Sequence, residues 1–160
     1  MADVGVKVGR RALACVLAAA LAWAAIPASA QQAQVEKLTI VTAKGARQTF
    51  DVEVMRNDAD RARGLMFRRM LPADRGMLFD FGREDEVAMW MQNTYIPLDM
   101  LFIRRDGTVA RIAANAEPLS TRTIPSGEPV LGVLEINGGE AAKRGIAPGD
   151  HVEHALFGRR

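Results

Sequence analysis

Short apolar runs separated by turn-forming residues constrain this 160-residue chain more than any other feature. In the run at residues 48–55, Phe50, Val52 and Val54 alternate with polar residues and would share one face of a strand. Gly45 suits a hairpin turn before this run, and Asp106-Gly107 suits another further along the chain. Expected strands cover residues 36–42, 48–55, 76–81, 86–92, 98–105, 108–114, 130–137 and 149–157. The pattern predicts a mainly β fold, a single compact antiparallel β-sandwich or small barrel.

Two short helical insertions are expected within this β domain. Asn57 or Asp58 can cap a first helix because either side chain accepts hydrogen bonds from free backbone amides, and Gly64 weakens any longer continuation. A second small helix is expected over residues 138–145, ending near Gly145. Both are too short to form a helical layer, so residues 37–160 are predicted to be one β domain.

The first thirty residues have the pattern of a cleaved secretory signal peptide. Lys7, Arg10 and Arg11 precede an apolar run over residues 12–26, and small residues at 28–30 follow it. The run is about fifteen residues long, shorter than the roughly twenty that span a membrane. We therefore expect an exported protein, periplasmic or extracellular, with no stable membrane span after cleavage and a flexible leader at residues 31–36. Retention of the segment as an anchor is the lesser alternative.

Loss of the signal peptide changes the charge of the chain. It removes Lys7, Arg10, Arg11 and Asp3, so basic residues fall from 21 to 18, acidic residues fall from 19 to 18, and the formal net charge becomes zero. A neutral chain indicates no nucleic-acid partner. A domain of this length buries enough surface to fold as a monomer without disulfides or a structural metal, and no cofactor is predicted.

The stretch MWMQNTYIPLDMLFI, residues 89–103, places polar residues inside an apolar run. One interpretation is structural: Asn93 and Asp99 hydrogen-bond backbone groups at a tight corner, and Trp90 is a core residue. In the other, Trp90 offers a flat apolar face and the two polar side chains line a site.

Glu135 interrupts a second apolar run, at residues 130–137. A buried carboxylate without a partner costs several kcal/mol or becomes protonated. A structural ion pair of Glu135 or Asp99 with Arg63 is one solution, and a ligand site is the other. The residues predicted to bind a ligand are Asp99, Asn93, Trp90, Arg63 and Glu135.

The favoured function is a binding module of the cell envelope for a small polar or carbohydrate ligand. One alternative is a hydrolase in which Asp99 and Glu135 act as acid and base on a glycosidic bond. Another is a protein–protein adaptor, and the choice between enzyme and binder stays open. Seven methionines follow residue 30. Thioethers bind Cu(I), but methionine more often fills cores, so no metal site is predicted.

Several motifs occur together in a fixed order. They are Arg63-Gly64-Leu65-Met66, Gly76-Met77-Leu78-Phe79, Trp90-Met91, Asn93-Thr94 and Pro97-Leu98-Asp99. In these motifs the chain resembles the family catalogued as domain of unknown function 192, over about residues 38–152. It departs from the family at Met89, where an aromatic residue is usual, and at Gln92, where a lysine is common. The resemblance implies a compact, mainly β domain and no established activity.

Overall fold

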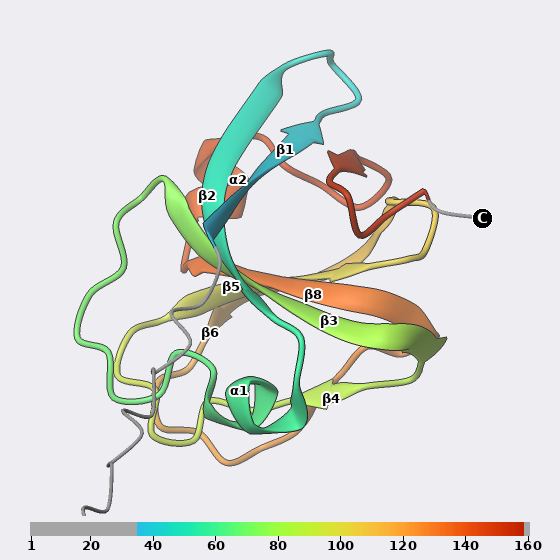
Figure 1. Cartoon of the computed structure of the whole chain (residues 1–160). Coiled ribbons are helices and arrows are strands. Elements are labelled where there is room, and N and C mark those ends of the chain that lie inside the picture. Colours follow the sequence, from blue (N-terminus) through green and yellow to red (C-terminus); the bar gives the residue numbers. More distant parts are fainter. Residues whose placement is uncertain (1–34, 159–160) are drawn as a thin grey trace, which may run out of the picture. The chain divides into compact units, whose positions relative to one another are not determined.

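The computed structural model describes residues 35–158, and the predicted signal peptide lies outside them. This part of the chain contains nine strands and two short helices (Figure 1). They are β1 (Val35–Val41), β2 (Arg47–Met55), α1 (Asp58–Arg63), β3 (Arg75–Asp85), β4 (Ala88–Met89), β5 (Leu98–Ile103), β6 (Val109–Ala116), β7 (Ile124–Pro125), β8 (Val130–Asn137), α2 (Glu140–Lys143) and β9 (His151–Glu153). The predicted mainly β fold with two helical insertions is confirmed.

Seven of these strands form one sheet in the order β6-β5-β8-β3-β2-β1-β9, and β4 and β7 form a small second sheet. The large sheet curls into a half-barrel. An isolated bridge between Thr108, just before β6, and His151 of β9 joins the two ends of the strand order. All neighbouring strands of the large sheet are antiparallel except β2 and β3, which are parallel. Residues 56–74, which contain α1, provide the long crossover that a parallel pair requires.

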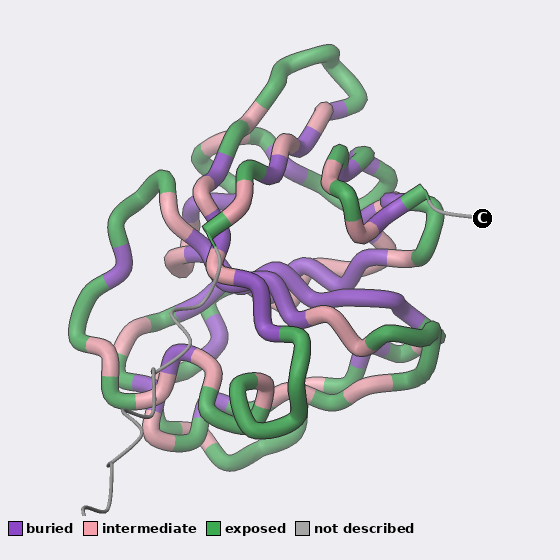
Figure 2. The backbone as a smooth tube through the Cα atoms, in the orientation of Figure 1, coloured by how far each residue is buried: buried purple, intermediate pink, exposed green. Residues whose placement is uncertain are grey.

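The central strands β3, β5 and β8 separate two hydrophobic cores, and they are the most continuously buried part of the chain (Figure 2). One core lies between these strands and β1, β2, β9 and α2; its members include Leu38, Phe50, Leu101, Leu134 and Val152. The other lies on the opposite face and includes Leu65, Phe79, Met91, Met100 and Val133. Because side chains alternate along a strand, each central strand contributes to both cores.

Turn and cap residues occupy the conformations that the sequence predicts. Gly45 has φ +80° in the β1–β2 turn, and Gly107 has φ +88° before β6. The side chain of Asn57 accepts a hydrogen bond of 2.9 Å from the amide of Asp60, which caps α1. Gly64 ends this helix with φ +47°.

The segment expected as a strand over residues 86–92 differs from the prediction. Only Ala88 and Met89 are in a strand, paired with β7, for which the sequence has no strand signal. The predicted alternation of faces still holds, since Met91 is buried and Trp90 is exposed. At the ends of the domain, β9 is limited to His151–Glu153, and β1 already begins at Val35 inside the expected leader.

Candidate functional site: a cavity over the central strands

A cavity of about 160 Å³ lies on the second core's side of the central strands. Its walls come from α1 with the Gly64-Leu65-Met66 segment, from β3, and from β4 with the residues that follow it. The lining residues are Arg61, Ala62, Arg63, Gly64, Leu65, Met66, Phe79, Phe81, Ala88, Met89, Trp90, Thr94 and Glu135. We call it the Glu135 cavity. Three of the five predicted site residues line it: Trp90, Arg63 and Glu135.

Gly64 shapes one wall by ending α1 abruptly. Its amide donates to the carbonyl of Asp60 at 2.9 Å, and its positive φ then redirects the chain so that Leu65 is buried. A Cβ on Gly64 would lie 3.1 Å from Cζ of Phe79, so this close approach also favours glycine. The RGLM motif therefore places its backbone directly against the aromatic ring of Phe79.

Asn93 supports the cavity wall without lining it. Its backbone has φ +56°, a left-handed conformation that asparagine tolerates better than most residues. Its carbonyl accepts a 2.8 Å hydrogen bond from the amide of Phe67, and its side-chain nitrogen lies 3.9 Å from the sulfur of Met66. Asn93 thus joins the corner after β4 to the segment that follows α1.

Glu135 is one of seven polar or charged residues within 35–158 that are buried as whole residues. The seven are Thr42, Thr94, Asp99, Ser126, Glu135, Glu140 and Asp150. Six of them take part in hydrogen bonds with backbone or side-chain groups of the domain. Glu135 is 4% exposed, and its carboxyl has no hydrogen bond or ion pair within the described domain. Burial raises the pKa of this carboxyl to about 8.

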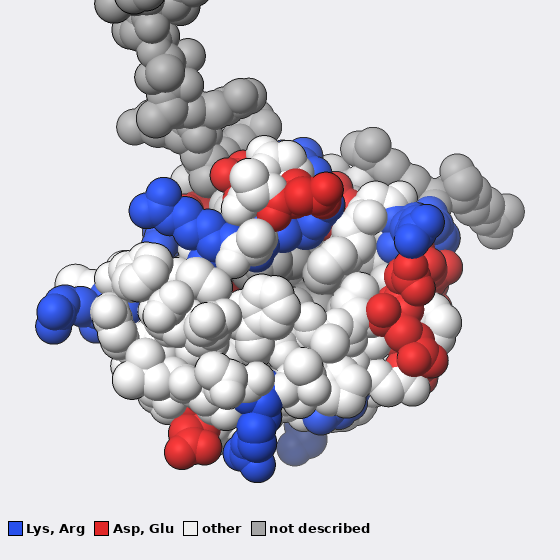
Figure 3. All heavy atoms as spheres, turned by 90° about the horizontal axis from the view of Figure 1, so that it is seen from below, with Lys and Arg blue, Asp and Glu red and all other residues white. Residues whose placement is uncertain are grey.

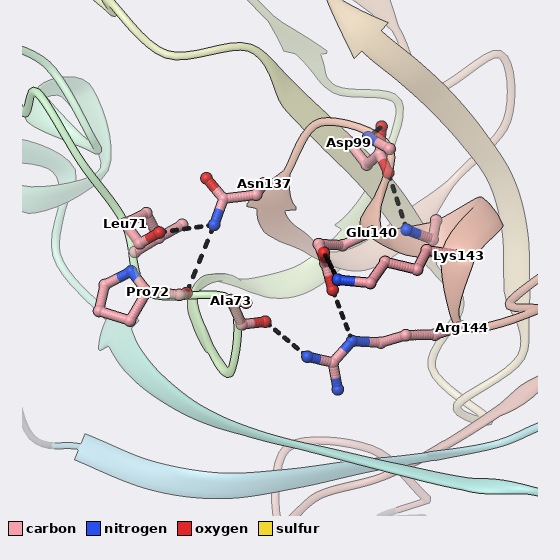
Figure 4. Close-up of polar contacts among 10 residues, drawn as sticks. Leu71, Pro72, Ala73, Asp99, Asn137, Glu140, Lys143 and Arg144 are labelled. Carbon is pink, nitrogen blue, oxygen red and sulfur yellow. Dashed lines mark hydrogen bonds and ion pairs between the residues drawn. The ribbon is translucent and has the colours of Figure 1, made fainter.

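Asp99 has a structural role in the same sheet. Its side chain is fully buried, and one carboxylate oxygen accepts from the amides of Asn115 at 2.8 Å and Gly139 at 3.0 Å. The other oxygen accepts from Ala141 at 2.9 Å, at the start of α2 (Figure 4). Asp99 therefore holds the loop before α2 and the end of β6 against β5, and it lies outside the Glu135 cavity.

The strand register places Asp99 and Glu135 on opposite faces of the sheet. On the β5–β8 ladder Asp99 is opposite Ile136, whereas Glu135 is opposite Met100. Residues directly opposite each other share a face, and successive residues of a strand point to opposite faces. The hydrolase hypothesis that paired these two carboxyl groups is therefore wrong.

The ion pair of Glu135 or Asp99 with Arg63, which was the alternative to a ligand site, is not formed among residues 35–158. Arg63 is exposed and makes no ion pair with the described part of the chain. The neighbouring Arg61 contacts other groups. It pairs with Asp58 and donates to the carbonyl of Asp80 at 2.6 Å. Its guanidinium also lies 5.8 Å from the ring centroid of Phe81. Among residues 35–158, Glu135 is thus left without a cationic partner.

Trp90 is 46% exposed at the cavity, so the alternative interpretation, in which it is a core residue, is wrong. Other exposed apolar side chains lie around the corner after β4, at residues 93–95. Phe67 makes an edge contact with Tyr95 at a centroid distance of 6.4 Å, and the amide of Leu119 donates to the carbonyl of Thr94 at 3.0 Å. Figure 3 shows the side that lies below α1 and β4 in Figure 1: uncharged atoms fill its middle and charged side chains lie around them.

Sequence reasoning missed Phe67 and Leu119 as surface features. Both have positive φ, +65° and +64°, and both are more than half exposed. A bulky residue in this conformation is a genuine outlier. Nothing in the local sequence signals it, because Phe67 follows Leu65-Met66 as if it continued an apolar run.

Residues 35–158 contain no cluster of three histidine, cysteine or acidic side chains that could hold a metal ion. They also contain no helix long and apolar enough to cross a membrane.

The fold and the cavity define a small half-barrel β protein whose cavity contains an acidic side chain without a partner among residues 35–158. A family model for DUF192, described as an uncharacterized ACR, matches residues 39–154, and the chain belongs to this family. No curated protein matches the chain.

Two solved structures are similar over most of the chain. One is a proposed transcription regulator from Sinorhizobium meliloti, 46% identical, with a TM-score of 0.77 over 79% of this chain and 98% of that one. The other is a protein of unknown function from Novosphingobium aromaticivorans, 44% identical, with a TM-score of 0.75 over 79% of this chain and 89% of that one.

Proposed function

We propose that this chain is an exported binding protein that holds a small polar ligand in the Glu135 cavity. The observation that supports this most is the Glu135 carboxyl, which is buried, lines the cavity and has no partner in the described domain. Leaving such a group unsatisfied costs about 1–3 kcal/mol or more. A ligand that supplies a hydrogen bond to Glu135 would recover that free energy on binding.

The rest of the lining suits a ligand with an apolar part. Phe79, Phe81, Leu65 and Met89 are carbon-rich or thioether side chains, and Trp90 presents a half-exposed ring. Small-molecule sites are mostly apolar with a few convergent polar groups, and the Glu135 cavity has this composition. Trp90 would cover the apolar part of the ligand, and Glu135 would fix its polar end.

The cavity volume limits the enclosed part of the ligand. Apolar cavities of about 150 Å³ hold a molecule the size of benzene. At about 160 Å³, the Glu135 cavity would enclose roughly six non-hydrogen atoms. A glycan would therefore insert only one substituent, with its ring against Trp90.

Export rests on the basic and apolar pattern of residues 1–30. Mass spectrometry of the protein recovered from an expressing bacterium tests it. The expected mass corresponds to a chain beginning at Gln31, and a full-length cytoplasmic product would contradict export.

The name of the Sinorhizobium relative raises nucleic-acid binding as another function. Residues 31–160 have a formal net charge of zero, and many arginines of the domain are in ion pairs, including Arg47, Arg56, Arg68 and Arg104. Phosphate backbones are bound by clusters of free positive charge. We therefore do not propose nucleic-acid binding for this chain.

Trp90 gives a direct test of binding, since Trp23 lies in the predicted signal peptide and Trp90 is the tryptophan that remains. The purified protein would be titrated with n-butylamine, 1-butanol, butyrate, glucose and N-acetylglucosamine while its fluorescence is recorded. At least one compound should change the emission saturably, and Glu135→Ala should weaken that binding about tenfold or more.

The matched control is Met70→Ala, because Met70 is 75% exposed and does not line the cavity. It should leave binding unchanged. An emission that no compound changes, or a binding curve that Glu135→Ala leaves intact, would contradict the proposed function.

A further inference from the structure

The carboxyl of Glu135 requires hydrogen-bond donors, and the domain supplies none. Its two oxygens have no partner among residues 35–158, and the facing strand neighbours are the thioether side chains of Met77 and Met100. An ionised carboxylate accepts only, at both oxygens. A ligand group with several N–H donors would satisfy it better than a single hydroxyl.

The walls around Glu135 favour a cation over a neutral donor. Phe79 and Trp90 line the cavity, and the negative faces of aromatic rings attract ammonium groups; the ring of Phe81, also in the lining, already contacts Arg61. Met66 and Met89 add polarisable sulfur. These groups would stabilise a positive charge that is already paired with Glu135.

The positive charges near the cavity do not oppose this arrangement strongly. The charged groups that line it with Glu135 are Arg61 and Arg63, both from α1, while β3, β4 and β5 present no ionisable side chain there. Arg61 is balanced by Asp58, and Arg63 is exposed to solvent, where its charge is screened.

We propose that the Glu135 cavity binds a primary alkylammonium group, whose nitrogen pairs with Glu135 and whose methylenes lie against Trp90 and the other apolar walls. This rests on the proposed function and names its ligand class. The volume of about 160 Å³ suits a chain of four carbons and one nitrogen. A free alkylamine and the side chain of a lysine in a peptide both have this chemistry.

Binding of the cation should depend on pH in a characteristic way. In the free protein the pKa of Glu135 is raised to about 8, so near neutral pH most molecules must release a proton before the ion pair forms. Affinity should therefore rise with pH by up to about tenfold per unit from pH 6 toward 8, and then level off until the amine itself loses its proton.

Isothermal titration calorimetry at pH 8 tests the ligand class with three probes of similar length: n-butylamine, 1-butanol and butyrate. We expect n-butylamine to bind at least about tenfold more tightly than 1-butanol, and butyrate not to bind. Glu135→Gln keeps the shape of the side chain and removes the charge, so it should reduce the preference for the amine to less than about threefold. Met70→Ala should keep the full preference.

A second measurement needs no variant. At pH 7, titration of n-butylamine in two buffers of different ionisation enthalpy should show release of close to one proton for each amine bound. Binding without proton release means either that the amine lies away from Glu135 or that Glu135 is already ionised in the free protein. If Glu135→Gln also leaves the affinity unchanged, the amine lies elsewhere and the inference is overturned.

A third experiment distinguishes a free alkylamine from a lysine side chain as the ligand. The blocked tripeptide acetyl-Gly-Lys-Gly-amide would be compared with n-butylamine and with the same peptide acetylated at the lysine. Tighter binding of the lysine peptide than of n-butylamine, lost on acetylation, would identify a peptide ligand. Binding of n-butylamine alone would identify a free amine.

The outcomes separate this inference from the proposed function. If 1-butanol or a sugar binds as tightly as n-butylamine and Glu135→Ala weakens it, the cavity is a ligand site but the alkylammonium class is wrong. If no probe binds to the folded protein, both proposals fail.

Discussion

Through Glu135, a rise in pH should act on stability and on binding in opposite directions: it lowers the stability and raises the affinity for an alkylammonium ligand. Its pKa is raised by burial from 4.5 to about 8. Between these two values the unfolded chain has lost the proton and the folded chain keeps it, so folding takes up a proton. Stability therefore falls as the pH rises from 4.5 to 8, by up to about 1.4 kcal/mol for each pH unit.

Glu135→Gln should remove this dependence, because the amide is neutral at every pH in that range. The free energy of unfolding of Glu135→Gln, minus that of the unaltered protein, should therefore be about 2–4 kcal/mol larger at pH 8 than at pH 5. Urea denaturation of both proteins at the two pH values measures it, and groups such as His154 cancel in the comparison. An unchanged difference would mean that the Glu135 carboxyl is ionised in the folded protein.

Asp99 should behave as a structural residue. Asp99→Ala removes the acceptor of three backbone amides, at Asn115, Gly139 and Ala141, of which the last is buried. We expect a loss of about 3 kcal/mol or more in unfolding free energy, and a smaller loss for Asp99→Asn, which keeps one acceptor oxygen. Chemical denaturation of the two variants checks this order. A stable Asp99→Ala protein with impaired n-butylamine binding would contradict the structural role.

At this scale the sequence could identify unusual residues but not separate their roles. Asp99 and Glu135 both interrupt apolar strands, so the pattern predicted a site at both positions. What separates them is the register between β5 and β8, which depends on long-range pairing. Trp90 and Glu135 meet at one cavity because β4 and β8 are brought together by the fold, far from each other in sequence.

At the scale of elements, strands with strong apolar patterns were predictable and the short irregular ones were not. The predicted runs at residues 48–55 and 130–137 match β2 and β8 closely. The pair β4 and β7 has only two residues on each side, and β7 contains Pro125, which strand patterns disfavour. The parallel pairing of β2 with β3 likewise follows from the crossover through α1, which local patterns do not reveal.

The turn that carries Leu119 holds an exposed leucine at φ +64°. A left-handed backbone costs a residue with a Cβ about 1 kcal/mol more than it costs glycine. Leu119→Gly should therefore be more stable than Leu119→Ala by roughly that amount, since both variants lose the same exposed side chain and only alanine keeps the strain. Thermal and urea denaturation of the pair measure it. Equal stabilities would mean that this turn relaxes when the leucine is removed.

On the scale of the whole molecule, Asp150 ties the two ends of the described chain together. Its carboxylate accepts from the amide of Ala43, after β1, at 2.8 Å and from Ala147 at 2.7 Å, and its carbonyl accepts from Val109, at the start of β6, at 2.9 Å. Asp150 is therefore one of the residues that join β1 and β6 near the two ends of the strand order, together with the bridge between Thr108 and His151.

Asp150→Ala should lower the free energy of unfolding by about 2–4 kcal/mol, because two amides lose a charged acceptor. Glu153→Ala in the adjacent strand is the control. It breaks only the exposed pair with Arg47 and should change stability little. Equal losses in the two variants would show that Asp150 does not hold the sheet edge.

Both proposals depend on Glu135 being a buried carboxyl that no group of residues 35–158 satisfies. A pH titration of its side-chain carboxyl carbon by nuclear magnetic resonance, with Glu135→Gln used to assign the signal, tests this most directly. We predict a pKa of about 8 in the protein without ligand. A titration midpoint in the ordinary glutamate range, near 4.5, would show that the carboxyl is solvated or paired, and would contradict the account.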